Sequence, residues 1–261
     1  AFQNESFGNS GIDGVVCFPH ADGCGQVEGR DMQILRRTLD GVGNHPNVAA
    51  AVMVGLGCET NQISYYTRSE DVSDTRTSQR GLTLQESGGT RRAVQDSVKA
   101  VWELIDETGD IERVDCPASK LVAALECGGS DAFSGVTSNP AVGYFSDLLV
   151  KQGGTVCLAE TTEICGAEHL LTRRATSKSV GDELLRMVEW YRNYIAAFPD
   201  APTVDSNPSP GNKAGGLTNI VEKSLGAVAK AGTSNLTAVY DYAERIDQAG
   251  FVFMNTPGYD P

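Results

Sequence analysis

Residues 153–169 read GGTVCLAETTEICGAEH, and this stretch decides how the rest of the chain is interpreted. Two glycines precede a short apolar run at 155–159, which predicts a buried β-strand. The run ends in a turn that holds Glu160 and Glu163, and Glu168 and His169 follow. An apolar strand, a turn rich in glycine, cysteine or acidic residues, and then a helical stretch form a unit that recurs along the chain.

Four further copies of this unit precede residue 153. Their strands are expected at 14–18, 48–55, 81–85 and 121–125, and helices at about 32–42, 91–108 and 140–152. Strands that alternate with helices predict a mostly parallel sheet, because parallel neighbours need a crossover connection. The strands are continuously apolar, as burial on both faces requires. We therefore predict an α/β fold with helices on both faces in Rossmann-like layers, and a site at the carboxyl ends of the strands.

The last third of the chain is expected to be mostly helical. Its predicted elements are helices at 182–198, 219–230 and 237–248, an irregular loop rich in proline and glycine at 205–218, and a strand at 251–254. We describe residues 1–180 as an α/β domain and residues 181–261 as a helical extension with a final strand. Both parts are expected to pack on one core as a single continuous domain.

Composition excludes several classes of partner. The 261 residues include 34 acidic and 21 basic side chains, which give a formal net charge of −13 at pH 7. No basic stripe offsets this balance, so nucleic acid is not an expected partner. Apolar runs such as 48–56 are far shorter than the roughly 20 residues that cross a bilayer, so no membrane span is expected. The chain begins without methionine and ends abruptly, and we expect it to be a segment of a longer protein.

The cysteines indicate the redox environment. There are seven, most of them beside glycine after an apolar run, and no Cys-x-x-Cys pair is present. An odd set in a chain of this size does not suggest a disulfide framework. A reducing cytoplasm is the expected location, and a structural zinc site is not expected.

The turn after residue 159 holds the densest group of candidate metal ligands. Glu160, Glu163, Glu168 and His169 combine carboxylates with an imidazole, a set that suits iron, manganese or magnesium. The alternative is that acidic residues favour the first turn of the next helix.

Earlier strand ends carry further candidates for metal binding or proton transfer. They are His20 with Cys24, Cys58 with Glu59, and Cys127. For each cysteine the alternative is an inert, small apolar residue.

Glycine-rich turns suggest anion binding. The pairs 88–89 and 128–129 offer backbone amides to a carboxylate or phosphate, although neither pair matches a nucleotide-binding motif. Lys213, in the loop at 205–218, is a candidate anion clamp or general base, with a solvated surface charge as the alternative.

Six stretches together resemble the altronate and galactarate dehydratase family, which includes the large subunit of sulfolactate sulfo-lyase. They are PHADGCGQ at 19–26, HPNVAAAVMVGLGCE at 45–59, ECGGSDAFSGVTSNPAVG at 126–143, GGTVCLAETTEICGAEHLLTRRA at 153–175, NPSPGNKAGGLTNIVEKSLG at 207–226 and FMNTPGYDP at 253–261. The chain departs from the family where His-Thr-Tyr-Gly-Cys is replaced by HADGC at 20–24, and where Glu-Thr-Pro-Glu is replaced by ETTE at 160–163.

The resemblance implies a cytoplasmic lyase that removes water from a sugar acid and gives a 2-keto-3-deoxy acid. It implies a divalent metal, with iron(II) favoured over manganese or magnesium. The candidate metal ligands are Glu160, Glu163, His169, Cys24, Cys58 and Cys127. His20 and Lys213 are candidates for the base and the acid. The candidate substrate-binding residues are Glu59, Ser130, Asp131, Arg173 (with Arg174 as its alternative), Asn207, Ser209 and Asn212.

Two other functions stay open at this point. One is a sulfo-lyase that releases sulfite from a sulfonated hydroxy acid. The other is an iron and cysteine binding or redox module without lyase activity. The expected partners are a small sugar-acid substrate, flanking domains of the same chain or a small partner subunit, and a second copy in a homo-oligomer.

Overall fold

Two parallel β-sheets carry the fold, one in each of two units, Ala1–Asp115 and Cys116–Pro261. The computed structural model describes residues 11–67, 78–109, 111–112, 114–198 and 204–258, together with Phe2, Glu5 and Phe7. All strand pairs in these residues are parallel, so the predicted α/β class with parallel sheets is confirmed. The predicted strands are divided between two sheets, and the border expected after residue 180 lies inside the second unit.

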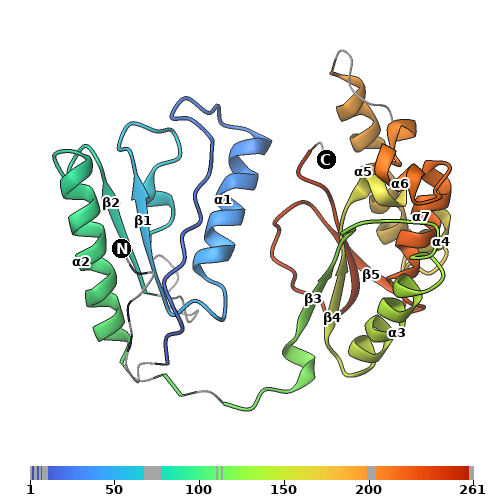
Figure 1. Ribbon diagram of the computed structural model, residues 1–261, viewed down its shortest axis with the longest axis horizontal. Coiled ribbons are helices and arrows are strands. Elements are labelled where there is room, and N and C mark those ends of the chain that lie inside the picture. Colours follow the sequence, from blue (N-terminus) through green and yellow to red (C-terminus); the bar gives the residue numbers. More distant parts are fainter. Residues whose placement is uncertain are drawn as a thin grey trace. The chain divides into compact units, whose positions relative to one another are not determined.

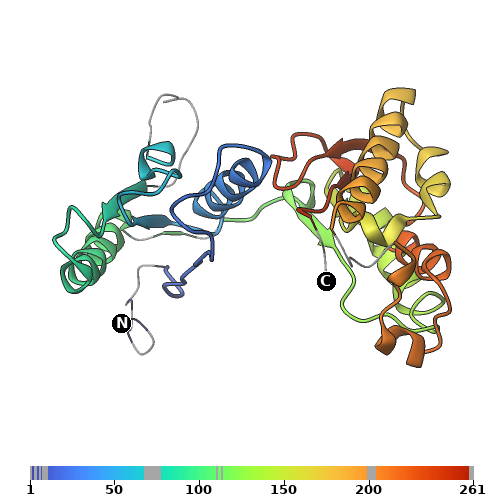
Figure 2. The same cartoon turned by 90° about the horizontal axis from the view of Figure 1, so that it is seen from above.

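The first unit is built on a two-stranded sheet. Its elements are α1 (Arg30–Gly43), β1 (Ala50–Gly55), the short 3-10 helix η1 (Ile63–Tyr65), β2 (Ser78–Thr83) and α2 (Thr90–Thr108). Ala50 of β1 lies opposite Ser78 of β2. Figures 1 and 2 show α1 and α2 on opposite sides of this strand pair.

The predicted strand at 14–18 is wrong. Residues 11–29 form no helix or strand, and Val16 and Phe18 are 72% and 56% exposed. This run belongs to neither sheet of the described residues, so it has no neighbouring strand to pair with.

The second unit holds a four-stranded sheet in the order β3-β4-β6-β5. The predicted strands at 121–125, 155–159 and 251–254 are confirmed, as are the helices at 140–152, 182–198 and 219–230. The elements are η2 (Ala118–Lys120), β3 (Val122–Leu125), α3 (Ser138–Lys151), β4 (Thr155–Leu158), η3 (Thr161–Ile164), α4 (Glu168–Thr172), α5 (Lys178–Ala196), η4 (Val204–Ser206), α6 (Pro210–Ala214), α7 (Ile220–Ala229), β5 (Leu236–Tyr240) and β6 (Gly250–Met254).

Helices cover one face of this four-stranded sheet. The connections from β3 to β4 and from β4 to β5 run in the same direction across the sheet, so right-handed crossovers place their helices on the same face. The main core lies there, where Val156, Phe251 and Phe253 pack against α5 and α7. Figures 1 and 2 show this one-sided arrangement. In this unit the helices therefore do not lie on both faces as expected.

The opposite face is covered by the connection at 241–249, where Ile246 packs against a small cluster that includes Cys157 and Val252. The predicted helix at 237–248 is wrong, because residues 237–240 belong to β5 and the rest forms no helix. Burial alternates along β5, as expected for a strand whose two faces differ. Thr237, Val239 and Tyr240 also favour extended backbone.

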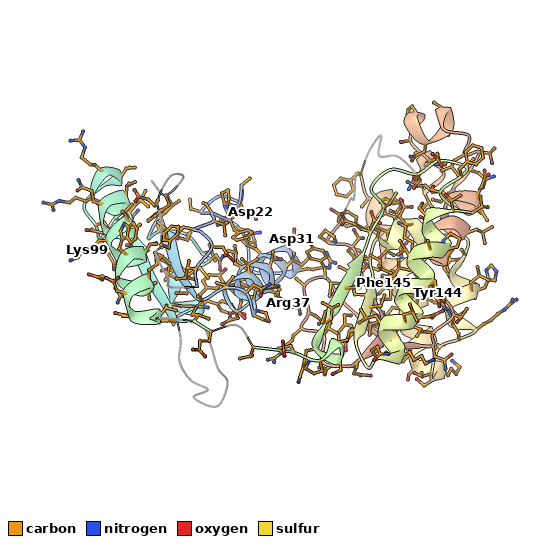
Figure 3. All side chains as sticks on the ribbon, turned by 60° about the horizontal axis from the view of Figure 1, so that its bottom comes forward. Asp22, Asp31, Arg37, Lys99, Tyr144 and Phe145 are labelled. Carbon is orange, nitrogen blue, oxygen red and sulfur yellow. The ribbon has the colours of Figure 1, made fainter. Side chains whose placement is uncertain are left out.

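Surface features of the second unit include aromatic side chains on α3. Tyr144 and Phe145 are 69% and 45% exposed, and both are labelled in Figure 3. None of the described helices combines the length and the apolar character needed to cross a membrane.

The seven cysteines are all free thiols, and their burial predicts two classes of reactivity. Burial raises the pKa of Cys157 to about 12 and that of Cys165 to about 11, so neither forms much thiolate near pH 8. We expect a disulfide reagent at pH 8 to modify the exposed Cys17, Cys24, Cys58 and Cys116 rapidly.

Mass spectrometry of the modified peptides measures this difference. Cys157 and Cys165 should react only after the protein is unfolded in guanidinium chloride. Rapid modification of either in the native protein would contradict the packing around β4 and η3.

Candidate functional site

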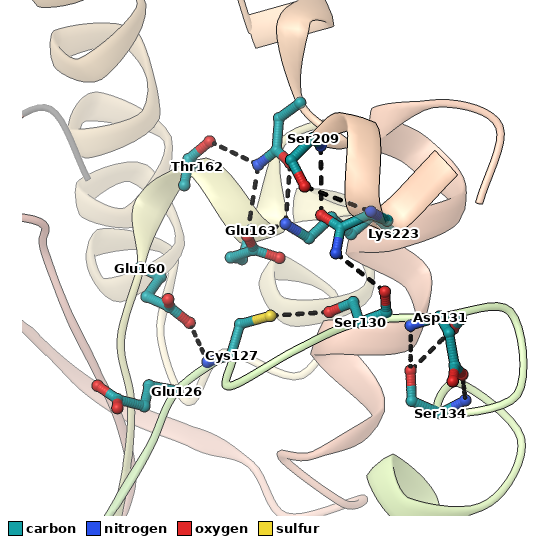
Figure 4. A network of polar contacts seen from close by, with 12 residues as sticks. Glu126, Cys127, Ser130, Asp131, Ser134, Glu160, Thr162, Glu163, Ser209 and Lys223 are labelled. Carbon is teal, nitrogen blue, oxygen red and sulfur yellow. Dashed lines mark hydrogen bonds and ion pairs between the residues drawn. The ribbon is translucent and has the colours of Figure 1, made fainter. Parts of the chain in front are cut away.

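The turns that follow β3 and β4 lie side by side, because these strands are paired with Leu125 opposite Leu158. Glu160 begins the turn after β4 with φ 70° and ψ 83°, a left-handed conformation that costs energy for a residue with a Cβ atom. Its Oε2 accepts a hydrogen bond from the backbone N–H of Cys127 at 2.5 Å (Figure 4). The structure therefore brings these two predicted site residues together.

A buried ion pair lies next to this contact. Glu163 and Lys223 are 4% and 8% exposed, and Lys223 Nζ is 2.7 Å from Glu163 Oε1. Lys223 Nζ also donates to Asn207 Oδ1 at 2.8 Å, and Asn207 Nδ2 donates to Glu163 Oε1 at 3.3 Å. Glu163 Oε2 is buried and has no hydrogen-bond partner among the described residues. These three residues form a polar network that joins η3, α7 and the segment before α6 (Figure 4).

The spacing of residues on α7 explains how Lys223 reaches this network. The Asn219 side chain caps the helix by accepting from the Glu222 N–H. Ile220, Lys223 and Ala227 then share the buried face, three and four residues apart. A lysine at this position has to bury its ammonium against η3, and Glu163 neutralises it there.

The segment at 205–218, predicted to be an irregular loop, contains α6. Ser209 and Asn212 form a capping box at its start, and Pro210 occupies the first turn. Asn212 Nδ2 also donates to the backbone oxygen of Ser130 at 2.9 Å. Ser209 and Asn212, both expected to bind substrate, therefore hold α6 in place, and Asn212 ties it to the turn after β3.

The turn after β3 is closed by its own polar side chains. Cys127 Sγ lies 2.7 Å from Ser130 Oγ (Figure 4). Asp131 Oδ1 accepts from the backbone N–H groups of Phe133 and Ser134 at 2.8 and 2.7 Å. In this arrangement Ser130 and Asp131 order the approach to α3.

The turn after β1 holds the candidates Cys58 and Glu59, and Cys24 reaches it through its backbone. The backbone oxygen of Cys24 accepts from the Thr60 N–H at 3.0 Å. The Glu59 carboxylate accepts from the N–H groups of Leu56 and Gly57 at 2.8 and 2.5 Å, so it closes this turn. Cys24, Cys58 and His20 are exposed.

Several predicted residues of the second unit stand outside the network. His169, Arg173 and Lys213 are exposed. Glu168 pairs with Arg192 of α5 at 2.9 Å. Arg174 donates to the backbone oxygens of Gly232 and Ser234, beyond the end of α7, at 2.6 and 3.0 Å. These hydrogen bonds give Arg174 a structural role in the fold.

The predicted metal ligands fit a cation only in part. Glu163 is neutralised by Lys223, and the Cys127 thiol is directed at Ser130. Within the described part of either unit, no three side chains of His, Cys, Asp or Glu converge. The groups that suit a hard divalent cation are the Glu160 carboxylate and the unpartnered Glu163 Oε2.

Sequence reasoning missed two buried lysines of the α7 region, Lys223 and Lys230. The signal was present, because both fall on the apolar side of the predicted helix at 219–230 and are seven residues apart. A charged residue on a buried helix face is unusual and calls for a partner.

Comparisons with known proteins cover both units. A family model described as D-galactarate/altronate dehydratase, C-terminal, matches residues 118–261, and one described as D-galactarate dehydratase/altronate hydrolase, second domain, matches residues 1–109. The galactarate dehydratase (L-threo-forming) of Escherichia coli is 43% identical over 86% of this chain and 43% of its own length. The altronate dehydratase of the same organism is 36% identical over 99% of this chain and 51% of its length.

A further relative differs in its described reaction. The (2R)-sulfolactate sulfo-lyase subunit beta of Chromohalobacter salexigens is 32% identical over 94% of this chain and 62% of its own length. The chain thus spans about half the length of the two dehydratases that it matches.

Proposed function

The chain belongs to the D-galactarate/altronate dehydratase family, and from this premise we propose that it removes water from a galactarate-like or altronate-like sugar acid and gives a 2-keto-3-deoxy acid. The observation that carries the proposal is the match of family models to both units of the chain. The site proposed for the reaction is the edge where the turns after β3 and β4 meet.

The reaction sets the demands on the site. The proton next to a carboxylate is very weakly acidic, so positive charge or fixed donors must stabilise the enediolate that forms when it leaves. A base accepts this proton, and an acid protonates the departing hydroxyl group. In the second unit we assign one of these tasks to Lys213, whose side chain is exposed. His20 of the first unit stays the sequence-based candidate for the other task.

Other residues of the second unit hold the elements that carry Glu160 and Lys213. The network of Glu163, Lys223 and Asn207 fixes η3 and thus the turn that presents Glu160. Asn212 holds α6, which carries Lys213, against the turn at Ser130. Arg173 is an exposed cation that we assign to a substrate carboxylate.

A divalent cation, iron(II) first and manganese or magnesium as alternatives, is part of the proposal. Glu160 and Glu163 Oε2 would hold it, since carboxylate oxygens suit these ions. When bound, such a cation would stabilise the negative charge that develops on the substrate. The proposed setting is the cytoplasm, with further domains of the same chain or a small partner subunit and a homo-oligomeric assembly.

The sulfo-lyase reaction is the second candidate, because one relative carries that name. The two reactions share proton removal and differ in the leaving group, which is water in one and sulfite in the other. The iron and cysteine redox module has no comparable support, because the relatives named above are dehydratases and a sulfo-lyase subunit.

The test is an anaerobic turnover assay of the chain with iron(II) and a panel of galactarate, altronate and sulfolactate. We expect a 2-keto acid from at least one sugar acid, loss of the activity in EDTA, and its return when iron(II) is added. Sulfite release from sulfolactate without sugar-acid turnover would favour the second candidate. No turnover of any compound in the panel would contradict both.

A further inference from the structure

A cavity of about 460 Å³ opens at the carboxyl end of β3. The glycines 128 and 129 line one side of it, Ser134 and Ser138 line another, and Lys230 lies at its wall. Its volume falls within the range of about 300–1,000 Å³ that is typical of small-molecule sites. A Cβ atom built on either glycine would meet no atom within 4 Å, so the space beside this turn is open.

Lys230 brings a buried positive charge to this cavity. The residue is only 7% exposed, and its Nζ donates to the backbone oxygen of Glu126 at 2.7 Å. In the described part of the chain this is its single side-chain bond, and it has no ion pair. The carboxylate of Glu126, which also lines the cavity, belongs to an exposed residue and is not paired with Lys230. Buried charges are normally paired, so Lys230 lacks a counter-ion.

The N-terminal end of α3 adds positive potential at the same place. Ser138 is the first residue of this 14-residue helix, and no side chain caps the helix start. The helix dipole favours an anion at this end, and it acts without the Asn139 N–H, which donates to the backbone oxygen of Ser134 at 2.9 Å, and without Pro140, which has no N–H. The Ser134 hydroxyl is engaged by the backbone of Asp131, whereas the Ser138 hydroxyl, which donates to the backbone oxygen of Ser134, can still accept a hydrogen bond from a ligand hydroxyl group.

We propose that this cavity binds a carboxylate of the sugar-acid substrate, with Lys230 as its counter-ion and the first turn of α3 as its second source of positive potential. The inference rests on the proposed function for the identity of the ligand. Lys230 is then a substrate-binding residue that supplies the local positive charge needed by a protein with an excess of acidic side chains.

Calorimetric titration with galactarate and galactitol tests the proposal. The two compounds share a six-carbon polyhydroxyl chain, and galactitol has alcohol groups in place of the carboxylates. In the iron(II) buffer we expect the wild-type chain to bind galactarate at least ten-fold more tightly than galactitol. Inorganic phosphate serves as a third probe and should compete weakly.

The variant Lys230→Met removes the charge and keeps an unbranched side chain. We expect it to bind galactarate at least ten-fold more weakly than the wild type, to bind galactitol equally well, and to raise KM more than it lowers kcat. Its melting temperature without ligand should not fall, because a buried charge without a counter-ion is removed. Lys151→Met, at the exposed far end of α3, is the matched control and should behave as wild type.

Three results would overturn the inference. They are unchanged galactarate binding in Lys230→Met, equal wild-type affinity for galactarate and galactitol, and a lower melting temperature of Lys230→Met with loss of both ligands. Failure of the proposed function looks different, since the wild type would then bind galactarate through Lys230 but turn over no sugar acid. If Lys230→Met turned over the sugar acid with an unchanged KM, the proposed function would stand and the inference would be refuted.

Discussion

Lys223→Met is expected to lower the free energy of unfolding of the second unit by about 3–5 kcal/mol, which is among the largest effects that a single substitution has. The ammonium of Lys223 is the ionic partner of Glu163, and both side chains are almost fully buried. Methionine has a similar length and fills the space. The free energy of unfolding therefore falls because the Glu163 carboxylate stays buried without a counter-ion. Asn207 loses a donor at the same time.

A double-mutant cycle separates this cause from a packing defect. Glu163→Gln alone leaves the lysine charge unpaired and should also destabilise, whereas the double variant has no buried charge. We expect the double variant to recover most of the loss, to within about 1–2 kcal/mol of wild type. Urea unfolding followed by circular dichroism at pH 7 measures all four proteins. Additive losses in the double variant would show that the two residues do not act as a pair.

Local patterns were sufficient to locate most elements of the second unit. The run at 155–159 is apolar, lies between glycines and an acidic turn, and is β4 in the structure. The run at 14–18 is similar in composition but forms no strand, because strand formation depends on a neighbour that a local pattern does not reveal. At 237–248 apolar residues also fit helical spacing, and pairing with β6 decides in favour of a strand.

The site was predictable where a rule of topology applied. Neighbouring parallel strands end at the same edge, and this rule placed Cys127 near Glu160. Lys223 and Lys230 were missed because their roles depend on which face of α7 meets the sheet. Arg174 was a candidate carboxylate binder for its charge alone, and only the fold shows that backbone oxygens near Gly232 and Ser234 engage it.

Gly143→Ala is expected to destabilise the second unit by about 2–3 kcal/mol, although alanine favours helices more than glycine does. A Cβ atom at Gly143 would lie 2.2 Å from the backbone oxygen of Ala229, at the end of α7, and 3.1 Å from the backbone nitrogen of Gly232. Both contacts involve backbone, so no side-chain rotation relieves them. Either α3 or α7 has to move, which strains the hydrogen bond of 2.7 Å from Ser146 Oγ to the backbone oxygen of Lys230.

A glycine-to-alanine substitution in α1 is the control, and we expect it to change the free energy of unfolding in the opposite direction. Gly41 also lies within a helix, and a Cβ atom there would meet no atom within 4 Å. Gly41→Ala should therefore stabilise the first unit by about 0.5–1 kcal/mol through helix propensity alone. Urea unfolding followed by tryptophan fluorescence reports the first unit through Trp102 in a Trp190→Phe background, and the second unit through Trp190 in a Trp102→Phe background. If Gly143→Ala stabilised the second unit as Gly41→Ala stabilises the first, the close backbone contact between Gly143 of α3 and Ala229 of α7 would be contradicted.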